Sequence, residues 1–336
     1  MVSSVVGFPA AARYLCRRLA LPVTVGAVAV AVAPTAAVAA PGAAAAAPAV
    51  IATIPVGIAP LGVATNPVTN TAYVANVGDN TVSVISGRTS TVTIPVGNAP
   101  HDAGTNPVTN TAYVTNVLDN TVSVISGKTN TVTAAIGVGT NPVGVATNPL
   151  TNTAFVTNDG DNTVSVINEK TNAVTATIGV GAEPSGVATN PVTNTAYVTN
   201  VGDNTVSVIN GKTDKVTATI GVGTQPFEIA TNPVTNTAYV TNDGDNTVSG
   251  INGKTDKVTA TIGVGTQPFG VATNPLTNTA YVANFGDNTV SVINGNTDKV
   301  TTIGVGTQPF GVATNPLTNT AYVTNDGSDT VSVISG

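Results

Sequence analysis

The sequence predicts an all-β fold, a seven-bladed β-propeller whose blades are four-stranded antiparallel sheets. Three observations predict it. One segment occurs seven times with only small changes, each copy contains several strand-like runs separated by turns, and the chain begins with the one run that the last copy lacks. Repeats of this kind take precedence over length, which alone would suggest about two domains.

The repeat is marked by the segment "NPxTNTAYV", which has Phe in place of Tyr in one copy. The seven copies are separated by 40, 42, 42, 42, 42 and 41 residues. A period near 42 with several strand signals per unit is typical of propellers. The copies begin at Asn66, Asn106, Asn148, Asn190, Asn232, Asn274 and Asn315.

Residues 185–222 show the strands and turns of one unit. The runs "SGVATN", "TAYVTN", "TVSVIN" and "VTATIGV" alternate with the turns "PVTN", "VGDN" and "GKTDK". Asn, Asp, Gly and Pro are the residues that tight turns favour. Loops this short join antiparallel neighbours, so each unit is expected to be a four-stranded meander. A parallel β-helix, the main alternative, has no reason to use such hairpins.

The two ends of the repeat region complement each other. Residues 49–57, "AVIATIPVG", match the fourth strand of a unit, "VTATIGVG" at 216–223, and the last copy ends after its third strand. We therefore expect the N-terminal strand to close the last blade. A ring closed in this way leaves no unpaired strand edge at its seam.

The residues before the repeats have the parts of a secretory signal peptide, predicted over 1–39. Arg13, Arg17 and Arg18 precede an apolar run at 19–34, and "AVA" follows at 37–39. An uncleaved membrane anchor and twin-arginine export are the alternatives. Residues 40–48 are a predicted low-complexity linker, and 49–336 the propeller. We expect a secreted or cell-surface protein, monomeric and without a membrane span in the mature chain.

Cleavage would change the chemistry available to the protein. Of the 11 Lys and Arg, three precede residue 49, so eight remain beside all 17 acidic residues, for a net charge of −9. Cys16, the single cysteine, is also lost, which excludes disulfides and thiol catalysis. An acidic chain is a poor candidate for nucleic-acid binding, which needs clustered basic residues.

The segments "YVTN", "YVAN" and "FVTN", together with "NTVSVI", carry a family resemblance. Over about 49–336 the sequence resembles the YVTN family of β-propeller repeats, which includes archaeal surface-layer proteins and secreted bacterial proteins. The resemblance implies the propeller fold. It is weak for function, because similar propellers serve as scaffolds, binding proteins and enzymes, among them streptogramin lyases, lactonases and quinoprotein-type dehydrogenases.

A dedicated site is expected where one copy breaks the pattern at the mouth of the central channel. The segment entering the first strand of each unit is the place to look, and there eight residues are candidates for a binding rim. Five are polar replacements: His101, Asp102, Glu183, Ser185 and Glu228. Three are aromatic: Phe227, Phe269 and Phe310.

These residues suggest three kinds of chemistry. His101, the only histidine, could act as a base among carboxylates. Asp102, Glu183 and Glu228 could hold Ca²⁺ or Mg²⁺, although no cofactor is predicted. The phenylalanines would suit a small ligand with an apolar part. The structural alternatives, which we favour, are sequence drift at a solvated rim and packing between blades.

Two regular sets are interpreted as structural. The aromatic residue of each unit is expected to be a wedge between blades: Tyr73, Tyr113, Phe155, Tyr197, Tyr239, Tyr281 and Tyr322. The recurrent aspartates, Asp79, Asp119, Asp161, Asp203, Asp245 and Asp287, are expected to stabilise their own turns.

The sequence therefore favours a binding or cell-surface interaction scaffold. Its ligand would be a protein, a cell-wall component or a small molecule. The alternative is a metal-assisted lyase or hydrolase with its site at the channel mouth. No nucleophile elbow, phosphate loop or histidine pair is present to support an enzyme.

Overall fold

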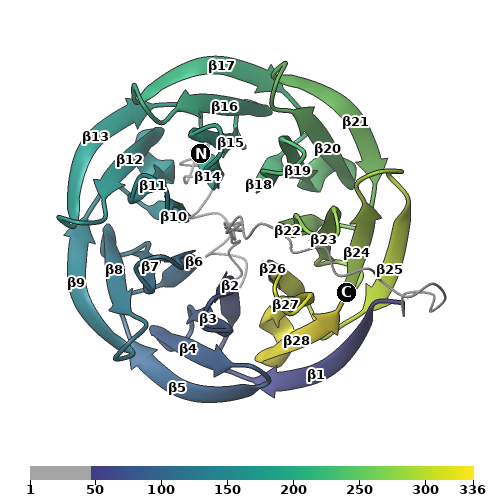
Figure 1. Cartoon of the computed structure of the whole chain (residues 1–336), viewed down its shortest axis with the longest axis horizontal. Helices are drawn as coiled ribbons and strands as arrows, with labels where there is room; N and C mark the ends of the chain where they lie inside the picture. The colour runs from purple at the N-terminus through teal and green to yellow at the C-terminus, as the bar shows by residue number, and fades with distance from the viewer. Residues whose placement is uncertain (1–46) are drawn as a thin grey trace, which may run out of the picture.

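The computed structural model describes residues 47–336 and confirms the predicted ring of blades. Seven four-stranded antiparallel sheets surround a central axis (Figure 1). Within this part of the chain there is no α-helix, and three 3-10 turns are present: η1 (Asp159–Asp161), η2 (Asp243–Asp245) and η3 (Asp326–Ser328). The predicted signal peptide, and the linker up to residue 46, lie outside the described residues.

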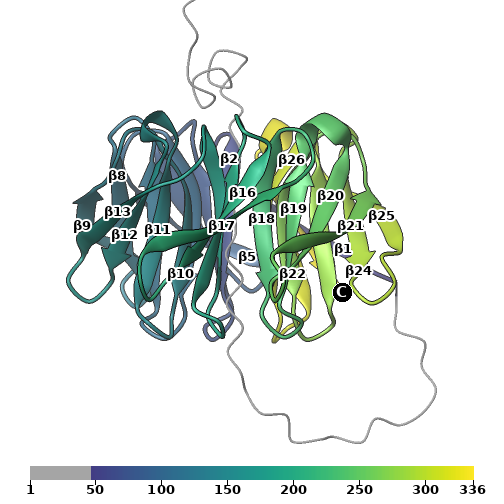
Figure 2. The same cartoon turned by 90° about the horizontal axis from the view of Figure 1, so that it is seen from above.

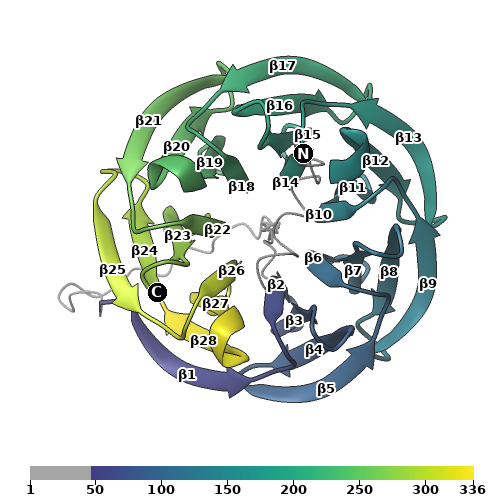
Figure 3. The ribbon, with the colours of Figure 1, turned by 180° about the vertical axis from the view of Figure 1, so that it is seen from behind.

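The first strand of each blade lies nearest the axis, as Figures 1 and 3 show from opposite sides. These inner strands are β2 (Pro60–Asn66), β6 (Pro100–Asn106), β10 (Pro142–Asn148), β14 (Pro184–Asn190), β18 (Pro226–Asn232), β22 (Pro268–Asn274) and β26 (Pro309–Asn315). The second strands are β3 (Thr71–Asn76), β7 (Thr111–Asn116), β11 (Thr153–Asn158), β15 (Thr195–Asn200), β19 (Thr237–Asn242), β23 (Thr279–Asn284) and β27 (Thr320–Asn325).

The third and fourth strands complete each blade toward the outside. The third strands are β4 (Thr81–Ser86), β8 (Thr121–Ser126), β12 (Thr163–Asn168), β16 (Thr205–Asn210), β20 (Thr247–Asn252), β24 (Thr289–Asn294) and β28 (Thr330–Ser335). The outer strands are β5 (Thr89–Pro95), β9 (Thr131–Gly137), β13 (Ala173–Gly179), β17 (Lys215–Gly221), β21 (Lys257–Gly263), β25 (Val300–Gly304) and β1 (Ala49–Pro55).

Because neighbouring strands are antiparallel, alternate turns lie on opposite faces of the ring. One face carries the turns that join the first strand to the second and the third strand to the fourth. We call it the Lys face, after the basic residues in these turns. The Asp face carries the turns between the second and third strands and the connections between blades. In Figure 2 the Lys face is the lower one, on the side where the C-terminus is marked.

The seam between the two ends of the chain is closed as the sequence predicts. β1 pairs antiparallel with β28, with Ile54 opposite Val331, so the last sheet has the order β1-β28-β27-β26. Ile54 is buried against Tyr322 and Val333 of the same blade. The N-terminal strand therefore supplies both backbone pairing and apolar burial to the last blade.

The core lies between blades rather than within them. One cluster joins Tyr197, Val208 and Ile220 of the fourth blade to Ile229 and Val240 of the fifth. The other six junctions contain equivalent clusters, each with the aromatic residue of the YVTN segment. The expectation that these rings are wedges between blades is confirmed, and it explains why both faces of each sheet are apolar.

A closed ring of hydrogen bonds surrounds the axis. In every inner strand a buried threonine donates its hydroxyl to the backbone carbonyl of the corresponding threonine in the preceding blade, at 2.6 Å in all seven cases. The donors are Thr65, Thr105, Thr147, Thr189, Thr231, Thr273 and Thr314. Thr65 donates to Thr314, so the ring joins the last blade to the first.

The threonine of the YVTN segment makes a second bond between blades. Thr199, for example, donates to the carbonyl of Phe227 in the next blade at 2.8 Å and accepts the N–H of Gly186 at 2.8 Å. Thr115, Thr157, Thr241 and Thr324 donate in the same way. In the two YVAN blades, Ala75 and Ala283 occupy this position, so two junctions lack the bond.

The recurrent aspartates are structural, but their partners differ from the expectation. Asp203 accepts the N–H of Ala182, 21 residues away in the connection that enters its blade, at 2.7 Å. The following Asn204 accepts the N–H of Gln225 in the connection to the next blade at 2.8 Å. The prediction that these aspartates stabilise their own turns is therefore wrong, because each "DN" pair binds two successive blade connections. In the seventh blade, Ser328 and Asp329 do the same.

Deleting residues 49–57 should open the ring. It removes β1, exposes the edge of β28 and uncovers the apolar residues around Tyr322. We expect a lower melting temperature and a broader unfolding transition, measured by circular dichroism and calorimetry. Deleting residues 40–48, the predicted linker, is the control and should leave the transition unchanged. An unaltered melting profile after removal of 49–57 would contradict the role of β1.

Restoring the missing threonines should stabilise the ring. By analogy with Thr199, Ala75→Thr would donate to the carbonyl of His101, and Ala283→Thr to that of Phe310. Each buried bond should raise the free energy of unfolding by about 0.5–1.5 kcal/mol. The matched control, Thr199→Ala, should lower it by about 1–3 kcal/mol because two buried backbone groups lose their partner. Urea denaturation measures both, and destabilisation by both additions would contradict this account.

Candidate functional site

The residues that vary between blades lie at an irregularity of the inner strand. In blade after blade the ladder to the second strand is interrupted between the proline and the valine, as between Pro60 and Val63. The two residues in between are not paired with the second strand. These positions hold seven of the eight candidates, all but Glu183. Bulges of this kind commonly adjust side chains near functional sites.

The aromatic candidates form a plug at the Asp-face end of the channel. Phe269 lies 5.1 Å from Phe227 and 5.0 Å from Phe310, ring centre to ring centre, and Phe285 from the next turn lies 5.1 Å from Phe269. Leu61, Val77, Ala99 and Val117 complete the cluster. Phe227, Phe269 and Phe310 are buried, so the structure brings these three candidates together as packing partners.

Asp102 and Glu228 come from the second and fifth blades and interact across the ring. Asp102 accepts the N–H of Val145 in the third blade at 2.8 Å, and Glu228 accepts the N–H of Ile229 at 2.7 Å. Burial, and to a lesser degree the negative charge of Asp102, raise the pKa of Glu228 well above its usual range. Burial and the nearby carboxylate thus both favour the neutral form of Glu228.

Gly104 has a physical explanation in the same junction. A Cβ atom at this position would lie 2.8 Å from the carbonyl oxygen of Val145. The backbone whose N–H group binds Asp102 thus occupies the space that the usual alanine would need. Asp102 and Gly104 are matched changes of the second blade.

His101 is buried, with 1% of its surface exposed. Burial lowers its pKa to about 3, and the nearby Val143 backbone acts in the opposite direction by a smaller amount. The imidazole is therefore neutral at physiological pH, and neither ring nitrogen has a hydrogen-bond partner within residues 47–336. The expectation of a solvated rim is wrong for His101, Asp102 and Glu228, because their side chains are buried.

Glu183 lies in the connection that enters the fourth blade, and Ser185 is the second residue of β14. Ser185 is buried, and its carbonyl accepts from Thr157. Glu183 is half-buried, has a left-handed backbone (φ 53°) and uses its N–H to bind Asn162. Within residues 47–336, no three His, Cys, Asp or Glu side chains converge as a metal site, so Asp102, Glu183 and Glu228 are not brought together as ligands.

Glu169 is a residue that the sequence analysis missed. It lies on the Lys face, in the turn after β12, where the other six blades have glycine. Elsewhere the asparagine that ends each inner strand donates to an asparagine of the next blade, as Asn66 does to Asn110 at 2.8 Å. At the junction of the second and third blades, Asn106 instead donates to Glu169. The sequence does contain a signal for this contact, because Glu169 is the single charged residue at a position that is glycine in every other blade.

The surroundings of Glu169 disfavour its charged form. It is almost fully buried, and its second carboxylate oxygen has no partner among the described residues. Burial raises its pKa to about 7, against the opposing hydrogen bond from Asn106. Burial, and then the nearby charge of Glu169, raise the pKa of Tyr113. This is a second irregular junction contact between the second and third blades.

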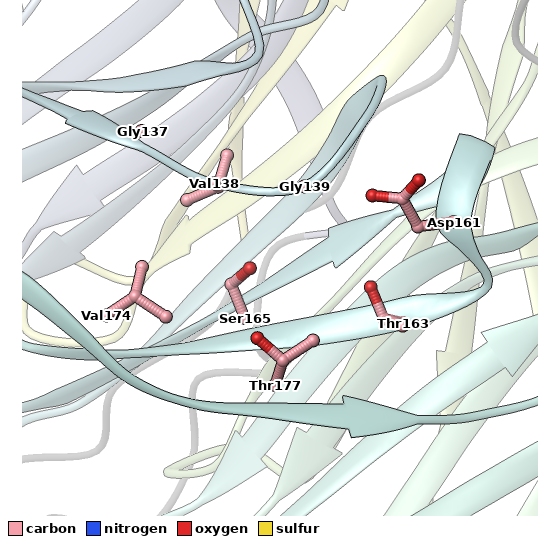
Figure 4. Close-up of a pocket in the computed structure, with 8 residues that line it drawn as sticks. All are labelled: Gly137, Val138, Gly139, Asp161, Thr163, Ser165, Val174 and Thr177. Carbon is pink, nitrogen blue, oxygen red and sulfur yellow. The ribbon is translucent and has the colours of Figure 1, made fainter.

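A cavity of about 380 Å³ lies on the outer flank of the third blade (Figure 4). Its polar groups are already engaged: Asp161 accepts from Thr140, while Thr163 and Ser165 both accept from Asn158. The same residue types recur at these positions in other blades. The cavity is therefore a feature of the repeat rather than a dedicated site.

Comparison with known proteins supports the fold and nothing finer. No family model and no curated protein is similar enough to this sequence to match it. Among solved structures, the chain is similar to a chain of hydrazine synthase from Kuenenia stuttgartiensis, with a TM-score of 0.77 and 20% identity. The match covers 83% of this chain and 96% of that one. At this identity the likeness shows a β-propeller fold alone.

The described residues also bear on membrane topology. None of their helices is long and apolar enough to cross a bilayer.

Neutralising Glu169 should change how stability depends on pH. The pKa of this carboxyl is about 7 in the folded protein and near 4.3 in an unfolded chain, so folding favours the protonated form. The stability that the protonated carboxyl contributes is fully present below the pKa of the unfolded chain, and it is lost as the pH rises through the pKa of the folded protein. The free energy of unfolding of Glu169→Gln should match that of wild type near pH 4 and exceed it at pH 8 by roughly 3–4 kcal/mol, since each unit of pKa difference corresponds to about 1.4 kcal/mol.

Urea denaturation across this pH range measures the difference between the two proteins. Other buried acids, such as Glu228, are present in both proteins, so their contributions to the pH dependence cancel in this difference. Lys170→Gln, at the exposed neighbouring residue, is the control and should leave the pH dependence as in wild type. Parallel curves for wild type and Glu169→Gln would show that the carboxyl does not carry this energy.

Proposed function

We propose that the protein is an exported propeller of the YVTN type that acts as a binding scaffold at the cell surface. The signal-like N-terminus and the seven repeats support export and family. The observation that carries the scaffold role is the burial of the irregular residues: His101, Asp102 and Glu228 are at most 1% exposed. The exposed surface, in contrast, consists of turns and outer strands that recur from blade to blade.

Burial weighs against the alternative, a metal-assisted lyase or hydrolase. A general base must reach the proton that it removes, and His101 lies among packed side chains beside the plug. Asp102 uses both carboxylate oxygens on backbone amides, those of Ala103 and Val145. These residues therefore act as packing and hydrogen-bonding groups of the channel wall.

A scaffold of this shape binds through surfaces that repeat around the ring. A partner that contacts several blades at once gains affinity from each, as linked binding sites do. The expected partner is therefore extended or multivalent, such as a protein array or a component of the cell envelope, rather than one small molecule held at the axis.

Calorimetric titration with Ca²⁺ and Mg²⁺ separates the scaffold from the metal-assisted enzyme. We expect no saturable submillimolar binding by wild type, because calcium needs six or more converging oxygens and the described carboxylates do not converge. Asp102→Asn combined with Glu228→Gln is the matched variant. Tight binding that this variant abolishes would overturn the scaffold role and favour the enzyme.

A further inference from the structure

A ring of exposed aliphatic side chains stands on the Lys face. In each blade the residue after the proline of the "NPxTN" turn is Val or Leu, and its exposed fraction ranges from 54% at Leu317 to 71% at Val192. The seven residues are Val68, Val108, Leu150, Val192, Val234, Leu276 and Leu317. We call them the aliphatic ring.

The turns hold the aliphatic ring in place without burying it. The N–H of Val192 binds the side-chain oxygen of Asn190 at 3.1 Å, and the N–H of Leu150 binds that of Asn148 at 3.1 Å. The asparagine and the proline fix the turn, so a polar side chain would serve equally well at the exposed position. The packing of the ring therefore does not require an aliphatic residue at any of the seven sites.

The same face carries every basic residue of the propeller. The eight are Arg88, Lys128, Lys170, Lys212, Lys215, Lys254, Lys257 and Lys299, all in or beside the outer turns and all exposed. Four acids share this face: Glu169, Asp214, Asp256 and Asp298. Within residues 47–336, eight basic and four acidic residues give the Lys face a formal charge of +4, whereas the other 13 acids, and no Lys or Arg, lie toward the Asp face.

A second copy of the chain does not fit this surface. Two Lys faces would bury the aliphatic rings but would bring like charges together. A Lys face on an Asp face would match the charges, but the exposed large apolar residues there are Ile58 and Leu118, too few to cover seven aliphatic side chains. A polyanion would match the charge and leave the aliphatic ring in water.

We propose that the Lys face docks on an anionic lipid bilayer. The aliphatic ring would enter the boundary between headgroups and acyl chains, while the surrounding lysines and Arg88 contact anionic headgroups. Peripheral binding of this kind depends on buried apolar area together with attraction to anionic lipid. The bilayer would be the partner of the proposed scaffold, and to that extent the inference rests on the proposed function.

Vesicle sedimentation tests the proposal. The full chain and a chain lacking residues 1–46, which keeps every strand of the ring, are each mixed with vesicles of phosphatidylcholine with or without an equal part of phosphatidylglycerol. We expect both proteins to bind the anionic vesicles, and the shorter chain to bind phosphatidylcholine alone at least about tenfold more weakly. Binding should weaken as salt is added.

Paired variants separate the two components of the surface. Val192→Ser with Val234→Ser should weaken binding to anionic vesicles about tenfold, because each change removes apolar surface from the bilayer. Lys212→Gln with Lys254→Gln should weaken it and flatten the salt dependence. The matched control, Ile58→Ser with Leu118→Ser, removes two exposed aliphatic residues from the Asp face and should bind as wild type does.

Three outcomes would overturn the proposal. One is no binding to anionic vesicles by the shorter chain. Another is binding that the serine pair leaves unchanged and that soluble polyphosphate abolishes, which would identify a polyanion site. The third is concentration-dependent association in sedimentation equilibrium that the serine pair abolishes, which would identify a second copy. Each leaves the scaffold role standing, whereas a metal-dependent site at Asp102 and Glu228 would remove that role without affecting vesicle binding.

Discussion

The ring of threonine hydrogen bonds around the axis is the constraint on which the rest of the structure depends. Each hydroxyl needs the carbonyl of the preceding blade at 2.6 Å, and the last donor is satisfied only if the ring closes. Seven buried bonds at about 1 kcal/mol each would contribute modestly to stability. Their larger effect is geometric, because they fix how close the inner strands approach one another.

That close approach decides which residues the channel accepts. A Cβ atom at Gly270 would lie 2.4 Å from the carbonyl oxygen of Phe310, and one at Gly311 would lie 2.5 Å from that of Leu61. Glycine is therefore needed at this position of the ordinary blade. Asp102 and Glu228 stand at this position in the second and fifth blades. Their carboxylates accept backbone N–H groups, and both side chains are buried rather than open to a ligand.

The parts of this arrangement that repeat could be predicted from the sequence, and the parts that depend on long-range geometry could not. The period, the turns and the displaced fourth strand predict the blades and their closure. The aspartates illustrate the limit: their regular spacing shows a structural role, but a partner 21 residues away depends on how the blade connection folds back. The burial of His101 likewise depends on the width of the channel, which no spacing in the sequence reveals.

Two of the irregular residues, Asp102 and Glu169, share one junction, and this gives them a common physical meaning. In a ring of repeats, stability is close to a sum of blade terms and junction terms. Between the second and third blades, Asp102 replaces glycine at one end of the inner strands, and Glu169 replaces an asparagine contact at the other. Both are acids removed from water, and the pKa of Glu169 lies near neutrality. The charge of the carboxyl therefore makes this junction weaker as the pH rises, while the other junctions keep neutral asparagine contacts. At this junction, a change at one face of the ring is thus accompanied by a change at the other.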